Sequence, residues 1–187
     1  MGRNRSEVQS MYLGSTGNIQ SFNETEADFP YPDLIGNAYR VSNAWFQMVR
    51  FASTASGAYA AGRMAYWFAP DDYSVTNEPT LAIGAIAGGK GNPNAAGIIV
   101  GAPTAGNLGF IQKTGKSLVD VFSTTISNPG FPAYAVSVGL YAVTPGYSWI
   151  SQIVGVAGAP IVAVWRTSSA AGTAVARADL LLRGSEL

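Results

Sequence analysis

The sequence contains no cysteine and no histidine among its 187 residues. Without them the chain has no disulfide, no Cys or His metal ligand, and no catalytic pair in which histidine activates a serine or a cysteine. Charge is also scarce, because charged residues make up only 12% of the chain, about half of their usual share in soluble domains. These absences exclude most enzyme chemistry, so we expect a protein that is not an enzyme and uses no cofactor and no metal.

The few charges balance, since 11 Lys and Arg residues stand against 11 Asp and Glu residues. A nucleic-acid surface needs a basic stripe that neutralises phosphates, and the only basic cluster is formed by Arg3 and Arg5. No apolar run reaches the ~18 residues that span a bilayer. The residues after the basic start are too polar for a secretory signal. We therefore expect neither a nucleic-acid partner nor a membrane partner.

From residue 38 onward the sequence has the rhythm of an all-β protein. Short runs of β-branched, aromatic and small residues are separated by Gly, Pro or Asn at intervals of about ten residues. We predict a β-sandwich or β-barrel of short antiparallel strands; the last run is also compatible with a short helix, because it is rich in Ala and Leu. The predicted strands cover residues 38–41, 44–51, 62–68, 81–87, 97–100, 109–114, 117–124, 133–143, 148–155, 160–165 and 173–182.

The strand predicted over residues 44–51 carries apolar side chains on both of its faces. A strand of this kind is typical of a sheet that is covered on both sides. One face has Trp45, Val49 and Phe51, and the other has Phe46 and Met48.

The first 37 residues lack sustained periodicity and end in Phe29-Pro-Tyr-Pro, where two prolines favour an extended backbone. We predict an extended N-terminal arm over residues 1–37 and a single β domain over residues 38–187. Aromatic and basic side chains in the arm favour docking onto a neighbouring subunit. The assembly contacts predicted on this basis are Arg3, Arg5, Phe22, Phe29 and Tyr31.

Two stretches look like phosphate-binding loops but lack the required chemistry. Gly84 to Lys90 is followed by Gly91, where a P-loop needs Ser or Thr to bind Mg²⁺. The stretch from Gly109 to Ser117 has five residues between its glycines, where the motif has four. Neither stretch is followed by a predicted helix that would face the phosphates, so we interpret both as turns.

A pair of carboxylates can catalyse hydrolysis without histidine, as in glycosidases. Asp71 and Asp72 are adjacent in a predicted turn after Pro70, and adjacent acids in such a turn are more often solvated caps. A hydrolase that uses Asp71 with a distant partner remains an alternative, although the solvated turn is favoured.

Two stretches resemble a known family. They are Gly62-Arg-Met-Ala-Tyr-Trp-Phe-Ala-Pro-Asp-Asp-Tyr-Ser-Val-Thr-Asn77, and Ala96 to Gly115 with the predicted strand that follows it. They resemble the head decoration, or cement, proteins of tailed bacteriophages, over roughly residues 38–125. The sequence departs from the family pattern at Gln112-Lys113-Thr114, where a more apolar strand end is expected. The resemblance implies that Gly106, Asn107 and Gly109 shape a hairpin, that Phe110 and Ile111 pack it, and that Gly115 turns the chain.

The resemblance also implies a function. Proteins of this family are structural and non-catalytic, and they bind the outside of a bacteriophage capsid, where they cement neighbouring capsid subunits. The expected partners are the major capsid protein and further copies of this chain, with a trimer favoured. The expected location is the capsid surface of the virion, after assembly in the host cytoplasm. A carbohydrate-binding or receptor-binding β-sandwich, as in a phage tail or fibre subunit, remains the alternative.

Overall fold

The computed structural model describes residues 16–53, 58–78, 81, 95–123, 132–135, 148–151, 161–167 and 172–181. These residues form a ten-stranded sheet with very little helix, so the predicted all-β class is confirmed. The helical elements are α2 (Thr16–Ser21) and two 3-10 turns, η1 (Pro32–Leu34) and η2 (Pro70–Asp72). The strands are β1 (Ala38–Val41), β2 (Ala44–Phe51), β3 (Met64–Ala69), β4 (Ser74–Thr76), β5 (Ala95–Val100), β6 (Leu108–Ser123), β7 (Pro132–Ala135), β8 (Ser148–Ser151), β9 (Ile161–Trp165) and β10 (Gly172–Leu181).

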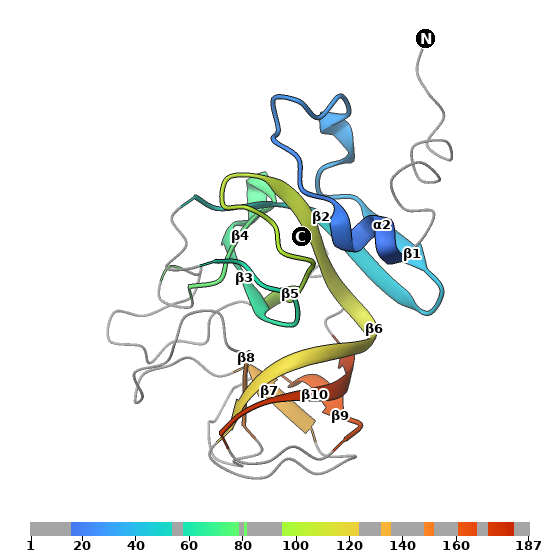
Figure 1. The fold of residues 1–187 in the computed structure, drawn as a ribbon, viewed down its shortest axis with the longest axis vertical. Coiled ribbons are helices and arrows are strands. Elements are labelled where there is room, and N and C mark those ends of the chain that lie inside the picture. Colours follow the sequence, from blue (N-terminus) through green and yellow to red (C-terminus); the bar gives the residue numbers. More distant parts are fainter. Residues whose placement is uncertain are drawn as a thin grey trace.

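The first half of the sheet closes on itself. Strand β2 pairs with β4, β4 with β3, β3 with β5, and β5 with the start of β6. The same part of β6 pairs back onto β2, from Leu108 to Thr114. These five strands therefore form a closed ring, which we call the first ring. It is the upper part of the molecule in Figure 1.

The interior of the first ring is filled by apolar side chains from all five strands. Along β2 and β3 they alternate with side chains on the opposite face, as the period of two in a β-strand requires. On β5 the two interior residues are three positions apart, because the pairing of β5 with β3 contains a bulge. Tyr59 joins them from the segment between β2 and β3, and its ring meets Phe51 edge to face with the centroids 4.8 Å apart. The interior residues are Val49, Phe51, Tyr59, Ala65, Trp67, Val75, Ala96, Ile99 and Ile111.

The second half of the sheet closes in the same way. The distal part of β6 pairs with β8, β8 with β7, β7 with β9, β9 with β10, and β10 back onto β6. We call this the second ring; it forms the lower part of Figure 1. Each ring has one parallel pairing, between the first and the third of its strands in chain order: β2 with β4 in the first ring, and β6 with β8 in the second. The four other pairings of each ring are antiparallel. The two rings have the same topology.

The register repeats as well as the topology. In the first ring, a bulge lies between Ala65 and Tyr66 where β3 pairs with β5. In the second ring, a bulge lies between Ala133 and Tyr134 where β7 pairs with β9. The parallel pairings also correspond, because Phe51 and Phe122 face the second residues of β4 and β8. The rings are therefore two versions of one supersecondary unit with little shared sequence.

Strand β6 belongs to both rings and bends between them at Gly115. The two strands predicted over 109–114 and 117–124 are thus one continuous strand. Gly115 has a φ of +91°, a left-handed conformation that glycine adopts without strain. A Cβ atom at this position would lie 2.7 Å from the carbonyl oxygen of Asn43 in the β1–β2 turn. Only glycine fits both the bend and this close approach.

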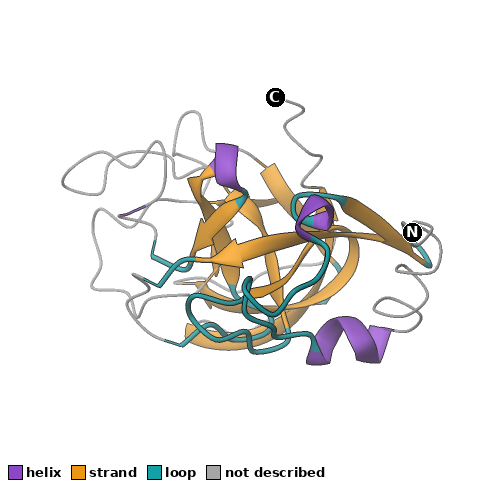
Figure 2. Cartoon of the chain, turned by 90° about the horizontal axis from the view of Figure 1, so that it is seen from above, coloured by secondary structure: helices purple, strands orange, loops and turns teal. Residues whose placement is uncertain are grey.

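The N-terminal segment, residues 16–37, differs from the extended arm that we expected. It begins with α2, the purple helix at the lower right of Figure 2. Its apolar side chains cluster with residues of β2 and β6. The reason is its apolar content, because five of its side chains pack with Phe46, Met48, Leu108 and Phe110 and thereby leave water. The buried residues that the segment contributes are Ile19, Phe22, Phe29, Leu34 and Ile35. Strand β2 is thus covered on both faces, as its two apolar faces predicted.

Most predicted strands agree with the structure in the described regions. The run predicted over residues 173–182 is a strand and not a helix, which the structure confirms with β10. The strands predicted from apolar runs do not include β4, which has only three residues and begins one residue after the η2 turn. In the strand predicted over residues 81–87, residues 82–87 lie outside the described residues.

Candidate interaction surface

A groove of about 920 Å³ lies where the two rings meet. One wall is the β1–β2 turn, from Val41 to Ala44, and the opposite wall is formed by Lys116, Leu118 and Asp179 at the start of the second ring. Gln20 of α2 and Ile99 of β5 also line this groove, which we call the junction groove. With Ala61 and Gly62, which precede β3, six segments that are separate in the sequence meet at one surface site.

Gln112 fixes the geometry of the junction. Its side chain is buried, and its amide nitrogen donates to the carbonyl oxygens of Thr114 at 3.1 Å and Lys116 at 2.9 Å. The two carbonyls lie on either side of Gly115, so one amide group bridges the bend. The buried amide of this polar residue therefore has hydrogen-bond partners within the bend, as buried polar groups generally do.

Large apolar side chains are exposed around the junction. Leu118 is 57% exposed on β6 and lines the junction groove. Trp45 of β2 is 43% exposed and Leu181 of β10 is 47% exposed, and both are register partners of Thr114 on β6. Single exposed apolar residues are common on proteins, but these three lie on adjacent strands. Such clustering is typical of surfaces that contact other proteins.

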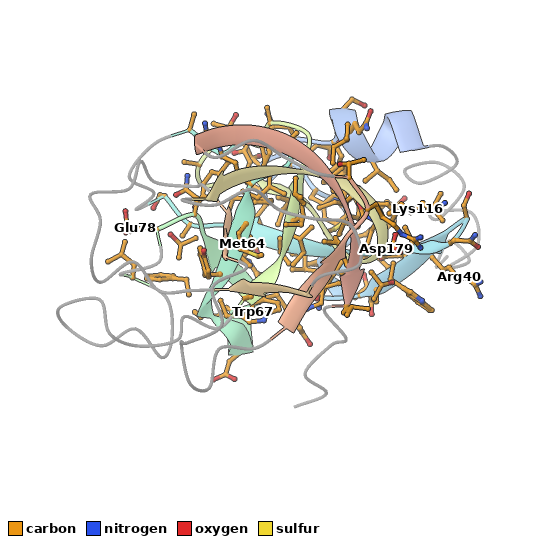
Figure 3. The ribbon with its side chains drawn as sticks, turned by 90° about the horizontal axis from the view of Figure 1, so that it is seen from below. Arg40, Met64, Trp67, Glu78, Lys116 and Asp179 are labelled. Atoms are coloured by element: carbon orange, nitrogen blue, oxygen red, sulfur yellow. The ribbon has the colours of Figure 1, made fainter. Side chains whose placement is uncertain are left out.

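The charges at the junction are only partly compensated. Arg166 forms an ion pair with Asp179, and this hydrogen-bonded contact raises the pKa of the Arg166 guanidinium. Within the part of the chain that the structure describes, neither Lys116 nor Arg40 forms an ion pair. Figure 3 shows Lys116 beside Asp179, and Arg40 further out on the β1–β2 hairpin. Among the described residues around the junction, the charges on Lys116 and Arg40 are therefore positive charges without an ion pair.

The predicted assembly contacts lie elsewhere or inside the core. Phe22 and Phe29 are 7% and 4% exposed, and their rings meet edge to face with the centroids 5.8 Å apart. Both rings are packed within their own chain, and their assignment as contacts to a neighbour stays a prediction. Tyr31 is half-buried and packs against the same cluster. Arg3 and Arg5 lie outside the described residues.

Polar contacts fix the N-terminal segment to the first ring. Arg50 of β2 forms a two-pronged ion pair with Glu26, with nitrogen–oxygen distances of 2.6 and 2.7 Å. This pairing lowers the pKa of Glu26 and raises the pKa of Arg50. The side chain of Asn23 accepts hydrogen bonds from the Thr104 backbone and the Asn107 amide. The segment is a fixed part of the fold.

Of the residues expected to shape a hairpin, Gly106 and Asn107 lie in the turn before β6, and Gly109 lies at the start of β6. Gly106 has a φ of +89°, and the amide of Asn107 donates to the Thr104 carbonyl, which describes a type II turn. A Cβ atom on Gly109 would lie 2.7 Å from the Phe51 ring. Phe110 is fully buried, and its ring centroid is 5.2 Å from that of Phe22.

Lys113 is a buried cation at the end of the first ring. It is 6% exposed, and its Nζ atom lies 5.2 Å from the centroid of the Trp67 ring. Burial lowers the pKa of Lys113 to about 8, although the ring favours the charged form. A lysine of lowered pKa can mark a catalytic site, but no acidic or nucleophilic side chain is recorded in contact with it among the described residues.

The remaining candidates for chemistry do not form a site. Asp71 and Asp72 are exposed in the η2 turn, where they fit the solvated caps favoured from the sequence. Among the described residues there is no group of three or more His, Cys, Asp or Glu side chains that could hold a metal ion. No helix in the described regions is long and apolar enough to cross a membrane.

Sequence reasoning missed the junction. The alternation along residues 44–51 predicts a covered face for Trp45, yet Trp45 is exposed, as is Leu118 on the strand predicted over residues 117–124. The pairings that place β2, β6 and β10 side by side connect residues that are far apart in the chain, so no local pattern reveals them. Gly115 was the available signal, because a glycine between two apolar strand runs is typical of a bend.

No protein-family model matches the sequence, and no curated protein does. Two solved structures of phage virion proteins are similar to the chain. The head fibre gp8.5 N base of bacteriophage phi29 has 12% identity and a TM-score of 0.41, over 76% of this chain and 98% of that chain. A chain in the capsid of Myoviridae phage XM1 has 17% identity and a TM-score of 0.46, over 76% of this chain and 88% of that chain.

Proposed function

We propose that this chain is a structural protein of a tailed-bacteriophage virion that binds the outside of the capsid and cements neighbouring capsid subunits. The observation that carries the proposal is the resemblance of residues 62–77 and 96–115 to head decoration proteins. These stretches are adjacent in space as well as recognisable in sequence. The first spans β3 and β4, the second spans β5 and the start of β6, and β3 pairs with β5.

The surface supports a structural role. The exposed cluster of Trp45, Leu118 and Leu181 has the composition of an interface core, in which aromatic and aliphatic groups replace charges. A protein with no net charge associates more readily than a strongly charged one. In a capsid this property is useful, because each copy is surrounded by neighbours on a lattice.

The function can be tested with purified protein and empty shells assembled from the major capsid protein. We expect the protein to sediment with the shells, to saturate at a fixed number of copies per shell, and to raise the temperature at which the shells come apart. Light scattering of the free protein should give the mass of a trimer. A protein that stays in the supernatant, but binds glycans on an array, would instead support the receptor-binding fibre alternative.

A further inference from the structure

Strand β1 is the one strand in the described sheet that pairs with a single neighbour. Each of the other nine strands has at least two partners, because the two rings close on themselves. Ring closure removes exposed sheet edges, whereas β1 pairs only with β2 and leaves its second edge open. An open edge is a template on which another strand can be added.

The hairpin geometry identifies the backbone groups on this edge. The turn has two residues, Ser42 and Asn43, so Val41 pairs with Ala44 and Tyr39 with Phe46. In an antiparallel hairpin, alternate residues exchange backbone hydrogen bonds with the partner strand, and the intervening residues point theirs away. The backbone N–H of Met48 donates to the Asn37 carbonyl, so the bonded residues continue at every second position before Tyr39. The N–H and C=O groups of Ala38 and Arg40 therefore face outward, and both residues are exposed.

We propose that the outer edge of β1 binds an extended strand of a capsid subunit, which carries a carboxylate opposite Arg40. Added strands of this kind gain affinity from main-chain hydrogen bonds and specificity from alternate side chains. The inference rests on the proposed function and names the part of the molecule that makes the contact. It does not require the N-terminal aromatic residues, which are buried in their own chain.

The charge at this edge favours an acidic partner over a second copy of the chain. Arg40 is the charged residue of β1, and its Nε atom donates to the Ser42 carbonyl at 3.2 Å, which leaves its terminal nitrogens outside this contact. The neighbouring wall of the junction groove contributes Lys116 and Asp179, and Asp179 is already paired with Arg166. Two β1 strands paired with each other would bring two Arg40 side chains into one small patch, and like charges destabilise such pairs. A carboxylate from a different chain removes this repulsion.

Trp45 adds an apolar contact on the same face. It is the register partner of Arg40 on β2 and is 43% exposed. A strand added to β1 would place every second side chain on the face that carries Arg40 and Trp45. The expected partner segment thus alternates, with its acidic and apolar side chains on this face.

Two substitutions separate the backbone contribution from the charge contribution. Ala38→Pro removes an outward N–H while the hairpin keeps the bonds of Tyr39 and Val41, and proline is tolerated on strand edges. Arg40→Glu reverses the charge and keeps the N–H. The matched control is Ala105→Pro, because Ala105 is exposed at the second position of the type II turn, where proline is favoured.

The measurement is the affinity of each variant for shells of the major capsid protein, with thermal melts to confirm folding. We expect Ala38→Pro and Arg40→Glu each to weaken binding by about tenfold, the latter less in high salt, while Ala105→Pro binds like the unmodified protein. If Ala38→Pro is unfolded, Arg40→Glu alone decides the question.

If both variants bind shells as tightly as the unmodified protein does, the role of β1 is overturned and capsid binding itself is unaffected. Failure of the unmodified protein to bind shells would overturn both proposals, and a change in oligomer mass with unchanged shell binding would assign the edge to a second copy.

Discussion

Gly106 and Gly115 have almost the same backbone conformation but very different surroundings. Their φ angles are +89° and +91°. A Cβ atom on Gly106 meets nothing within 4 Å, whereas one on Gly115 lies 2.7 Å from the Asn43 carbonyl oxygen and 2.9 Å from Ala44 Cα. The pair therefore separates the cost of a left-handed backbone from the cost of a steric clash.

Alanine substitution at the two glycines should have unequal effects on stability. Gly106→Ala should lower the free energy of unfolding by about 1 kcal/mol, the cost of the left-handed conformation. Gly115→Ala should lower it by about 3 kcal/mol, because the β1–β2 turn must also move. Urea unfolding of both variants measures the difference. Equal losses would contradict the close contact between β6 and the β1–β2 turn.

Lys113 should make stability depend on pH in the alkaline range. Burial lowers its pKa to about 8 in the folded protein, and the unfolded value is about 10.4. Between these values the unfolded state holds the proton and the folded state does not, so stability rises with pH. The rise from pH 7 to pH 9.5 should be on the order of 2 kcal/mol.

Lys113→Met is the comparison for this effect, because it keeps a long aliphatic side chain and removes the charge. The variant should be more stable than the unmodified protein at pH 7 and should lose the rise. Burial raises the pKa of Tyr59 to about 12, and tyrosine titrates at about 10 in the unfolded state. The ionisation of tyrosine in the unfolded state lowers stability as the pH rises, which is opposite to the effect of Lys113. Measurements below pH 9.5 avoid most of this loss. An equal rise in both proteins would show that Lys113 is not its source.

The N-terminal segment shows which elements can be predicted from the sequence. Strands β1 and β2 match the predicted ranges because alternating apolar residues and a two-residue turn are local signals. The segment before them has no periodicity, and its apolar residues are irregularly spaced because they fill gaps on an existing surface. Whether Phe22 packs on its own chain or on a neighbour depends on contacts such as Phe22 with Phe110, which a local pattern does not encode.

Phe22 tests whether this element belongs to the core. Phe22→Ala removes a ring that is 7% exposed and contacts two other aromatic rings, so stability should fall by about 3–5 kcal/mol. The control is Phe68→Ala, because Phe68 is 38% exposed and its loss should cost less than about 1 kcal/mol. Chemical unfolding measures both. Full stability of Phe22→Ala together with lost shell binding would return Phe22 to the assembly contacts.

At the scale of the whole molecule, the repetition of the ring could not be predicted from the sequence. Residues 104–112 and 144–152 each contain a glycine followed by an aromatic-Ile pair. These two stretches contribute to β6 and β8, which are not equivalent strands of the two rings. The equivalent positions share few identities, such as Ala65-Tyr66 with Ala133-Tyr134 at the bulge. A small ring requires alternation and closure more than particular residues, so the topology can persist while the sequence diverges.

The shared strand predicts how the molecule unfolds. Strand β6 supplies one wall of each ring, and residues 114–123 pair with β10 while residues 108–114 pair with β2. Because the two parts of this strand are continuous through the bend at Gly115, we expect the loss of one ring to destabilise the other, so that both unfold in one cooperative transition, as in a single domain. Calorimetry should give one peak, with a calorimetric enthalpy equal to the van't Hoff enthalpy. Gly115→Ala should shift this peak as a whole, because the bend couples the rings. Two separate peaks in the unmodified protein, or a split peak in the variant, would show that each ring keeps its own part of β6 and folds independently.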